Sequence, residues 1–165
     1  ESETVEISIS PNAVGFCGET WNLRAGLLQG NYQDCLSLAQ GFFEQSQGGF
    51  LVDRETFKNH LNRARLFAFS EDAERLCVGV SLNSDGFTIK SQNLSGRYIG
   101  DGEAEGTGKP GEWEWNPDFA LAWLNQAEGE KIRVGFVGPG KAIVLEDIGD
   151  ANFSSMVSPM GSREK

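Results

Sequence analysis

The stretch from Gly49 to Phe57, GFLVDRETF, recurs in outline from Gly111 to Phe119 as GEWEWNPDF. In each copy an extended segment containing apolar residues meets an Asp or an Asn, residue types that cap helix N-termini. The second copy adds a Pro at the first helical position, where the missing N–H costs nothing. Because a repeat of this size determines the architecture of a chain, the sequence predicts two copies of one strand-helix unit.

Hydrophobic periodicity predicts that each copy continues as one helix and several strands. In the first copy, a strand at 49–53 precedes a helix at about 54–66, with an inward stripe of Phe57, Leu61 and Ala64. Alternating residues then predict strands near 66–70, 75–82, 86–91 and 94–104. The second copy predicts a strand at 112–115, a helix at about 117–127, and strands at 131–137, 141–146 and 152–158.

The first 40 residues predict a three-stranded meander that resembles the last strands of the second copy. We therefore interpret 1–40 as half of another domain, 41–48 as an irregular linker, 49–160 as a complete domain and 161–165 as a tail. The predicted class is α+β, with both helices on one side of antiparallel sheet. One face of the meander is apolar and lacks a helix, so upstream sequence or a second molecule must cover it. That face carries Val5, Ile7, Ile9, Trp21, Leu23 and Leu27.

The composition argues against several classes of protein. The 165 residues are 39% hydrophobic, which is enough for a core, and carry a formal net charge of −10. The average surface therefore repels nucleic acid, and any DNA contact needs a local basic patch. No run of about 18 apolar residues is present, so no membrane span is expected. Three cysteines and one histidine fit no metal-ligand spacing, so we expect neither a metal nor a cofactor.

The candidate catalytic groups do not predict an enzyme. Glu112 with Glu114, and Glu146 with Asp147, are carboxylate pairs, but nothing indicates desolvated surroundings. We interpret both pairs as solvated. His60 has no nucleophile at the spacing of a catalytic triad, and we expect it to be exposed on a polar helix face.

Four segments carry a resemblance to a known family: Leu27–Asp34, Val52–Arg65, Asn116–Leu124 and Met156–Met160. Their order and spacing together resemble the bacterial DNA sliding clamp, the beta subunit of DNA polymerase III. Leu27–Asp34 resembles the end of the clamp middle domain, and Val52–Arg65 resembles the first helix of the third domain. Asn116–Leu124 resembles the second helix of that domain, and Met156–Met160 resembles the closing Met-Pro-Met. The resemblance covers nearly the whole chain, from the second half of the middle domain through the third domain.

The resemblance implies a pseudo-symmetric clamp fold with a non-catalytic role in DNA replication. Clamp subunits form a homodimeric ring around duplex DNA, with helices lining the hole. The helix residues expected to face DNA are Arg54, Lys58, Arg63 and Arg65, although a simply solvated helix face is the alternative. The second helix weakens this expectation, because residues 117–127 contain no Lys or Arg. The implied location is the cytoplasm, at the bacterial nucleoid.

The resemblance also implies a groove that binds peptides of the polymerase and the clamp loader. The matching positions are Ser37, Leu38, Asn116, Phe119, Ala142, Met156, Ser158, Pro159 and Met160, unless these are core residues. The chain departs from the clamp pattern at Gln33, Cys35 and Ser158, and it continues past the usual end through 161–165. These departures leave two alternatives open: a diverged accessory or mobile-element clamp, and a protein-only interaction domain that does not load on DNA.

Overall fold

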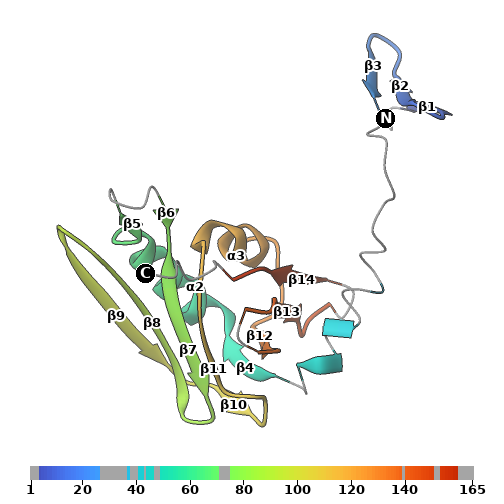
Figure 1. Cartoon of the computed structure of the whole chain (residues 1–165). Helices are drawn as coiled ribbons and strands as arrows, with labels where there is room; N and C mark the ends of the chain where they lie inside the picture. The colour runs from blue at the N-terminus through green and yellow to red at the C-terminus, as the bar shows by residue number, and fades with distance from the viewer. Residues whose placement is uncertain are drawn as a thin grey trace. The chain divides into compact units, whose positions relative to one another are not determined.

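The computed structural model describes residues 4–26, 37, 41–42, 44–46, 49–70, 75–138, 140–150 and 153–159. The chain divides into two compact units, residues 1–34 and 35–165 (Figure 1). The first boundary therefore falls a few residues before the predicted end at 40.

The first unit is the predicted antiparallel meander, with strands in the order β1 (Glu6–Ser10), β2 (Ala13–Cys17) and β3 (Asn22–Gly26). Ile7 lies opposite Phe16, and Phe16 lies opposite Leu23, so an apolar row crosses all three strands. Ile7 and Leu23 are each 58% exposed, and Ile9 is 80% exposed. The apolar face is therefore open within the described part of this unit. Leu27 lies outside the described residues.

The second unit contains both copies of the predicted repeat. The first copy has β4 (Phe50–Asp53), α2 (Arg54–Arg65), a short hairpin and then three strands. The hairpin consists of β5 (Phe69–Ser70) and β6 (Arg75–Leu76). The three strands are β7 (Val78–Asn83), β8 (Gly86–Asn93) and β9 (Gly96–Gly102). After β10 (Glu105–Gly106), the second copy has β11 (Gly111–Trp115), α3 (Pro117–Leu124), β12 (Lys131–Phe136), β13 (Ile143–Asp147) and β14 (Ser154–Val157).

Each copy contributes its first strand to the sheet formed by the other copy. One sheet has the order β10-β4-β12-β13-β14 and the other has the order β11-β7-β8-β9. The registers match closely, because Val52 pairs with Ile132 just as Trp115 pairs with Val78. The exchange confirms the predicted repeat and its pseudo-symmetry.

The two helices begin in the predicted way. The Asp53 side chain accepts a hydrogen bond from the Thr56 N–H at 2.7 Å, and Asn116 accepts one from the Asp118 N–H at 2.9 Å. These caps satisfy amide donors that the first helical turn leaves free. The helices contact each other, and α2 also contacts β7, β8 and β9 (Figure 1).

Buried positions correspond between the helices when they are counted from the caps. Phe57 corresponds to Ala120, and Leu61 corresponds to Leu124; all four side chains are 0% exposed. Ala64 and Ala127, at 0% and 2%, form the third pair. Phe119 is one residue too early to match Phe57, and it is 65% exposed. The sequence comparison of Phe57 with Phe119 was therefore wrong by one residue.

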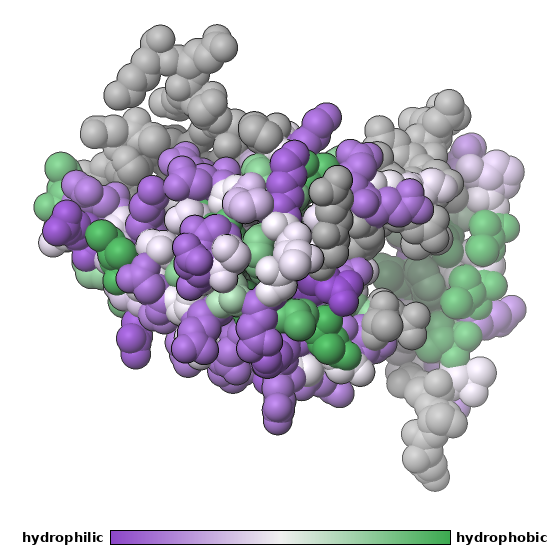
Figure 2. Space-filling model, turned by 90° about the horizontal axis from the view of Figure 1, so that it is seen from below, coloured by the Kyte–Doolittle hydropathy of each residue, from purple (hydrophilic) through white to green (hydrophobic). Residues whose placement is uncertain are grey.

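The core lies on the inward faces of the two sheets and on the buried helix stripes. Alternation places the apolar residues of β7, β8 and β11 inward, while Glu112 and Glu114 on the opposite face are exposed. Figure 2 shows a largely hydrophilic surface with scattered hydrophobic residues, as expected for the outside of such layers. The largest fully buried side chain is that of Trp115.

Several boundaries differ from the sequence predictions. Residues 41–42 and 44–45 are helical, so the predicted linker at 41–48 is not wholly irregular. Within this segment Ser46 is 3% exposed, because Gly135 has no side chain and leaves room beside it. The helix predicted to reach 127 ends at Leu124, and the strand predicted at 94–104 is limited to β9. The single strand predicted at 75–82 is divided into β6 and β7.

Candidate functional site

The candidate peptide groove begins at the first turn of α3. Asn116 caps the helix, and Phe119 follows in the first turn with an exposed ring. Ala120, the next residue, takes the buried position, so Phe119 is turned toward the surface. An exposed aromatic ring of this size is suited to contact with an apolar partner.

The remaining groove candidates come from the edge of the neighbouring sheet. Met156 on β14 is half-buried and pairs with Val144, while Ala142 immediately precedes β13. Contacts between α3 and β14 bring this edge next to the helix that carries Phe119. Just after β14, Ser158 is exposed and Pro159 is half-buried. Ser37, which belongs to an earlier helical segment and not to this sheet edge, is exposed. Leu38 and Met160 lie outside the described residues.

A cavity of about 390 Å³ occupies the corresponding place in the first copy. Its lining includes Thr56, which corresponds to Phe119, and Glu103, which corresponds to Ser158 when the strand registers are matched. The cavity is lined by Leu51, Asp53, Thr56, Phe87, Gly102, Glu103, Glu105 and Lys131. Hydrogen bonds from the hydroxyl and amide of Thr56 lower the pKa of the Asp53 carboxyl. The two equivalent places therefore differ in chemistry, because the first copy has a threonine and a carboxylate where the second has an aromatic ring and a serine hydroxyl.

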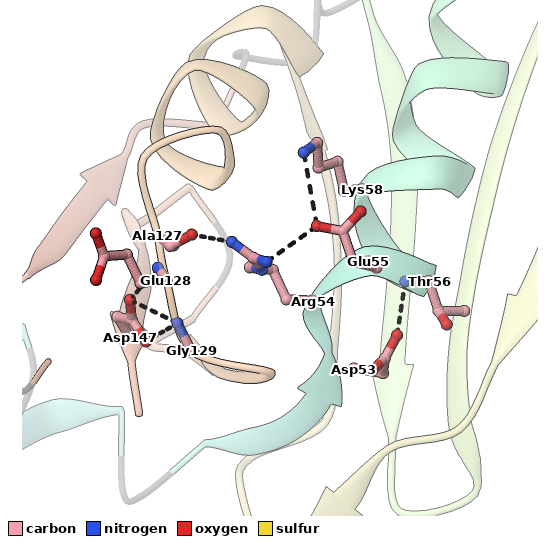
Figure 3. A network of polar contacts seen from close by, with 9 residues as sticks. All are labelled: Asp53, Arg54, Glu55, Thr56, Lys58, Ala127, Glu128, Gly129 and Asp147. Carbon is pink, nitrogen blue, oxygen red and sulfur yellow. Dashed lines mark hydrogen bonds and ion pairs between the residues drawn. The ribbon is translucent and has the colours of Figure 1, made fainter. Parts of the chain in front are cut away.

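The basic residues expected to face DNA have different surroundings in the structure. Arg54 lies between the start of α2 and the end of α3, where its guanidinium donates to the Ala127 carbonyl (Figure 3). Lys58 is 23% exposed, with its Nζ 3.6 Å from Glu55 Oε1. Arg65 Nε is 2.6 Å from Asp118 Oδ1 on α3. Arg63 is exposed in the last turn of α2.

His60 is not an exposed residue of a polar face, which corrects the sequence interpretation. Its Nδ1 is 2.6 Å from the Tyr98 hydroxyl, and its ring meets that of Phe87 edge to face at 5.8 Å. Gly100 has no side chain, and a Cβ at that position would collide with both His60 and Tyr98. Burial lowers the pKa of His60 and the nearby Arg63 lowers it further, while Asp101 opposes the shift. The imidazole is therefore neutral near pH 7.

Asp147 is also not a solvated carboxylate, although Glu112 and Glu114 are exposed as predicted. Asp147 is 2% exposed and accepts hydrogen bonds from the amides of Glu128 at 2.8 Å, Gly129 at 3.1 Å and Gly149 at 2.8 Å. Burial alone would raise the pKa of its carboxyl, but these amides and that of Asp150 lower it overall. The carboxylate is a structural anion that fastens the turn after α3 to the end of β13.

Neither role was predictable from the sequence, because most of the partners lie far away along the chain. A weak signal for Asp147 is the glycine in each of its two turns, Gly129 and Gly149, which place backbone amides close to the carboxylate. Across the described ranges, no group of three or more metal-ligating side chains is arranged to hold a metal ion. Nor does the described chain contain a helix both long and apolar enough to span a membrane.

A family model described as the DNA polymerase III beta subunit, C-terminal domain, matches residues 43–161. No curated protein matches the sequence. Among solved structures, the C. crescentus beta sliding clamp aligns with a TM-score of 0.78 at 18% identity, over 96% of this chain and 41% of that chain. The Bacillus subtilis sliding clamp aligns with a TM-score of 0.74 at 23% identity, over 96% and 41%.

The Pseudomonas aeruginosa sliding clamp aligns with a TM-score of 0.73 at 15% identity, over 96% of this chain and 42% of that chain. At these identities the structural matches establish the sliding-clamp fold. The coverage values show that this chain spans about two fifths of the length of the clamps that it matches. Because the family model covers most of the sequence, the chain belongs to the family of the DNA polymerase III beta subunit, through its C-terminal domain.

Proposed function

We propose that this chain is part of a sliding clamp, a non-catalytic processivity factor that retains replication proteins on duplex DNA. The observation that carries the proposal is the pair of reciprocally paired repeats within a domain of the beta-subunit family. A ring holds DNA by topology, so it requires neither base recognition nor a catalytic group. The proposed place of action is the nucleoid in the bacterial cytoplasm.

A ring requires more clamp domains than this chain contains, because the chain spans about two fifths of the matched clamps. We propose a homo-oligomeric ring for the full-length protein. Native mass spectrometry gives the number of subunits, and a retention assay with a clamp loader compares circular with linearised plasmid. Retention on the circle that is lost on linearisation supports encirclement. Equal retention on both forms, or none on either, contradicts it.

The proposed partner peptides bind across α3 and β14. Their apolar end would contact Phe119 and Met156, and burial of each apolar peptide side chain contributes about 1.5–3 kcal/mol. An affinity in the micromolar range, about −8 kcal/mol, suits a site that several proteins use in turn. The described groove positions are Ser37, Asn116, Phe119, Ala142, Met156, Ser158 and Pro159.

A peptide titration with two matched variants tests the groove. Phe119→Ala removes an exposed ring, so it should preserve folding while weakening a peptide with an apolar end by about tenfold or more. Leu94→Ala is the control, because Leu94 is 91% exposed on the turn between β8 and β9. Equal weakening by both variants, or by neither, contradicts the groove.

The altered groove favours one alternative, an accessory clamp that has lost ordinary peptide docking. Ser158 stands where the clamp pattern has its first closing Met, and it is exposed. Retention on circular DNA without peptide binding supports this alternative. Peptide binding without DNA retention supports a protein-only interaction domain.

A further inference from the structure

Three of the four basic residues of α2 lie on one flank of the helix. Arg54, Lys58 and Arg65 are spaced at i, i+4 and i+11, which places them on one side at 3.6 residues per turn. This flank faces α3, because Arg54 contacts Ala127 and Arg65 contacts Asp118. Arg54 and Arg65 therefore make contacts across the helix pair, and Lys58 lies on the same flank of α2.

Arg54 has the most extensive contacts of the three. Its guanidinium donates to the Ala127 carbonyl, and its Nη2 is 3.1 Å from Glu55 Oε1 (Figure 3). The side chain is only 20% exposed. The last turn of α3 has no basic residue, so Arg54 supplies the positive charge that a helix C-terminus favours. If Arg54 turned toward a phosphate, the Ala127 carbonyl would lose this donor.

Lys58 and Arg65 each have a carboxylate partner. Glu55 lies within 3.6 Å of Lys58, and Asp118 lies within 2.6 Å of Arg65. Each carboxylate offsets the positive charge that a nearby phosphate would experience. These two cations are therefore weaker candidates for DNA contact than their position in the sequence indicates.

The free polar groups of α2 lie on its other exposed side. Asn59, Asn62 and Arg63 are all exposed, and their side chains take part in no hydrogen bond or ion pair within the described ranges. The helix segment of α3 contains no Lys or Arg. Arg63 is thus the free cation of the described helix pair, and two amide side chains lie beside it.

We propose that Arg63 makes the phosphate contact of this domain, with Asn59 and Asn62 as neighbouring amide donors, while Arg54 and Arg65 hold α2 against α3 and Lys58 pairs with Glu55 on α2 itself. The assignment rests on the proposed function, because it concerns the helix face that a clamp presents to DNA. Each neutralised phosphate contributes about 0.9 to the slope of log affinity against log salt. The helix pair then contributes roughly one contact, where the sequence alone indicates four.

The test is fluorescence anisotropy of the full chain with a labelled random-sequence duplex over a series of low salt concentrations. Arg63→Gln should weaken binding on the order of tenfold at low salt and reduce the salt slope by about 0.9. Lys58→Gln is the matched control and should change the affinity less than twofold. Arg63→Lys should restore most of the affinity, because it restores the charge. Thermal unfolding should show a lower midpoint for Arg54→Met and an unchanged midpoint for Arg63→Gln.

The possible outcomes separate this assignment from the proposed function. If Lys58→Gln or Arg65→Gln weakens binding while Arg63→Gln does not, the assignment is overturned and DNA binding stands. An unchanged unfolding midpoint for Arg54→Met overturns the role given to Arg54. If the unaltered chain shows no affinity for the duplex at the lowest salt, both the assignment and the proposed DNA contact fail.

Discussion

The two copies of the repeat share the same backbone arrangement, but different side chains make the contacts at equivalent positions. Ser91 and Asp147 occupy equivalent strand positions beside the helix ends. The Ser91 hydroxyl donates to the Ala64 carbonyl at 2.6 Å, whereas the Asp147 carboxylate accepts from the amides after Ala127. One copy therefore closes its helix end with a neutral donor, and the other copy closes it with an anion.

A second pair of equivalent residues also differs in chemistry between the two copies. His60 and Trp123 are both seven residues after their caps. They meet Tyr98 on β9 and Phe153 immediately before β14, which are equivalent positions. His60 shares a hydrogen bond with Tyr98, whereas Trp123 stacks on Phe153 with ring centroids 5.4 Å apart. The fold requires a large side chain at this position and accepts either a polar or an apolar contact. Such divergence gives the two halves of the domain different pH responses.

The largest expected effect concerns the position where the copies agree. Leu61→Ala and Leu124→Ala each remove a fully buried side chain from the equivalent helix face. Each variant should lose about 2–5 kcal/mol of unfolding free energy, because a cavity replaces packed atoms. Urea denaturation followed by circular dichroism measures both. A loss below about 1 kcal/mol in only one variant would show that the two helices are not equivalent in the core.

The next effect concerns the helix ends, where the copies differ. Asp147→Asn should cost about 1.5–3 kcal/mol, because a charged acceptor is lost and its amide donors stay buried. Ser91→Ala should cost about 1 kcal/mol, the usual contribution of a neutral hydrogen bond. Denaturation at neutral pH compares the two variants.

The lowered pKa of Asp147 gives the same comparison a pH dependence. Its stabilising effect is complete above the ordinary carboxyl pKa and is lost as the pH falls through the lower folded pKa. The acid limb of the stability profile should therefore become shallower in Asp147→Asn and stay unchanged in Ser91→Ala. Parallel profiles in all three proteins would contradict the anion's role.

The helix caps provide a test in which the copies should respond alike. Asp53→Ala and Asn116→Ala each remove one acceptor for a first-turn amide. Each should cost about 1 kcal/mol of unfolding free energy. Asp53→Asn and Asn116→Asp are the controls and should cost only a fraction of that. A negligible cost at one position alone would show that the two helix starts differ in strength.

The smallest expected effect separates the His60 side of the domain from the Trp123 side. Because the folded pKa of His60 lies below its ordinary value of 6.5, the unfolded chain binds more protons between the two values. Stability should therefore fall as the pH drops through and below 6.5. His60→Phe with Tyr98→Phe imitates the other copy and should remove this step, while Trp123→Phe should retain it. A step that persists in the double variant would come from another group.

The fold was predictable from local signals, because each copy contains a helix-capping residue and an apolar stripe at helical spacing. Asp53 and Asn116 cap the helices, and Phe57, Leu61 and Ala64 are buried as predicted. The roles of His60, Arg54 and Asp147 were not predictable, because strand pairing and helix contacts over long separations provide Tyr98, Ala127 and Gly129 as their partners. The groove residues stay a prediction, with Phe119 exposed as such a site requires and Leu38 and Met160 outside the described residues.

The exchange of β4 and β11 between the sheets has a consequence for folding. One sheet is complete only when Val52 on β4 pairs with Ile132 on β12. The other is complete only when Trp115 on β11 pairs with Val78 on β7. Neither half of the domain has a finished sheet until the other half has arrived. Such distant pairings slow folding, because loop closure is unfavourable until the contacts form. We therefore expect the domain to appear in a single cooperative step, and its halves, if separated, to regain order only when mixed.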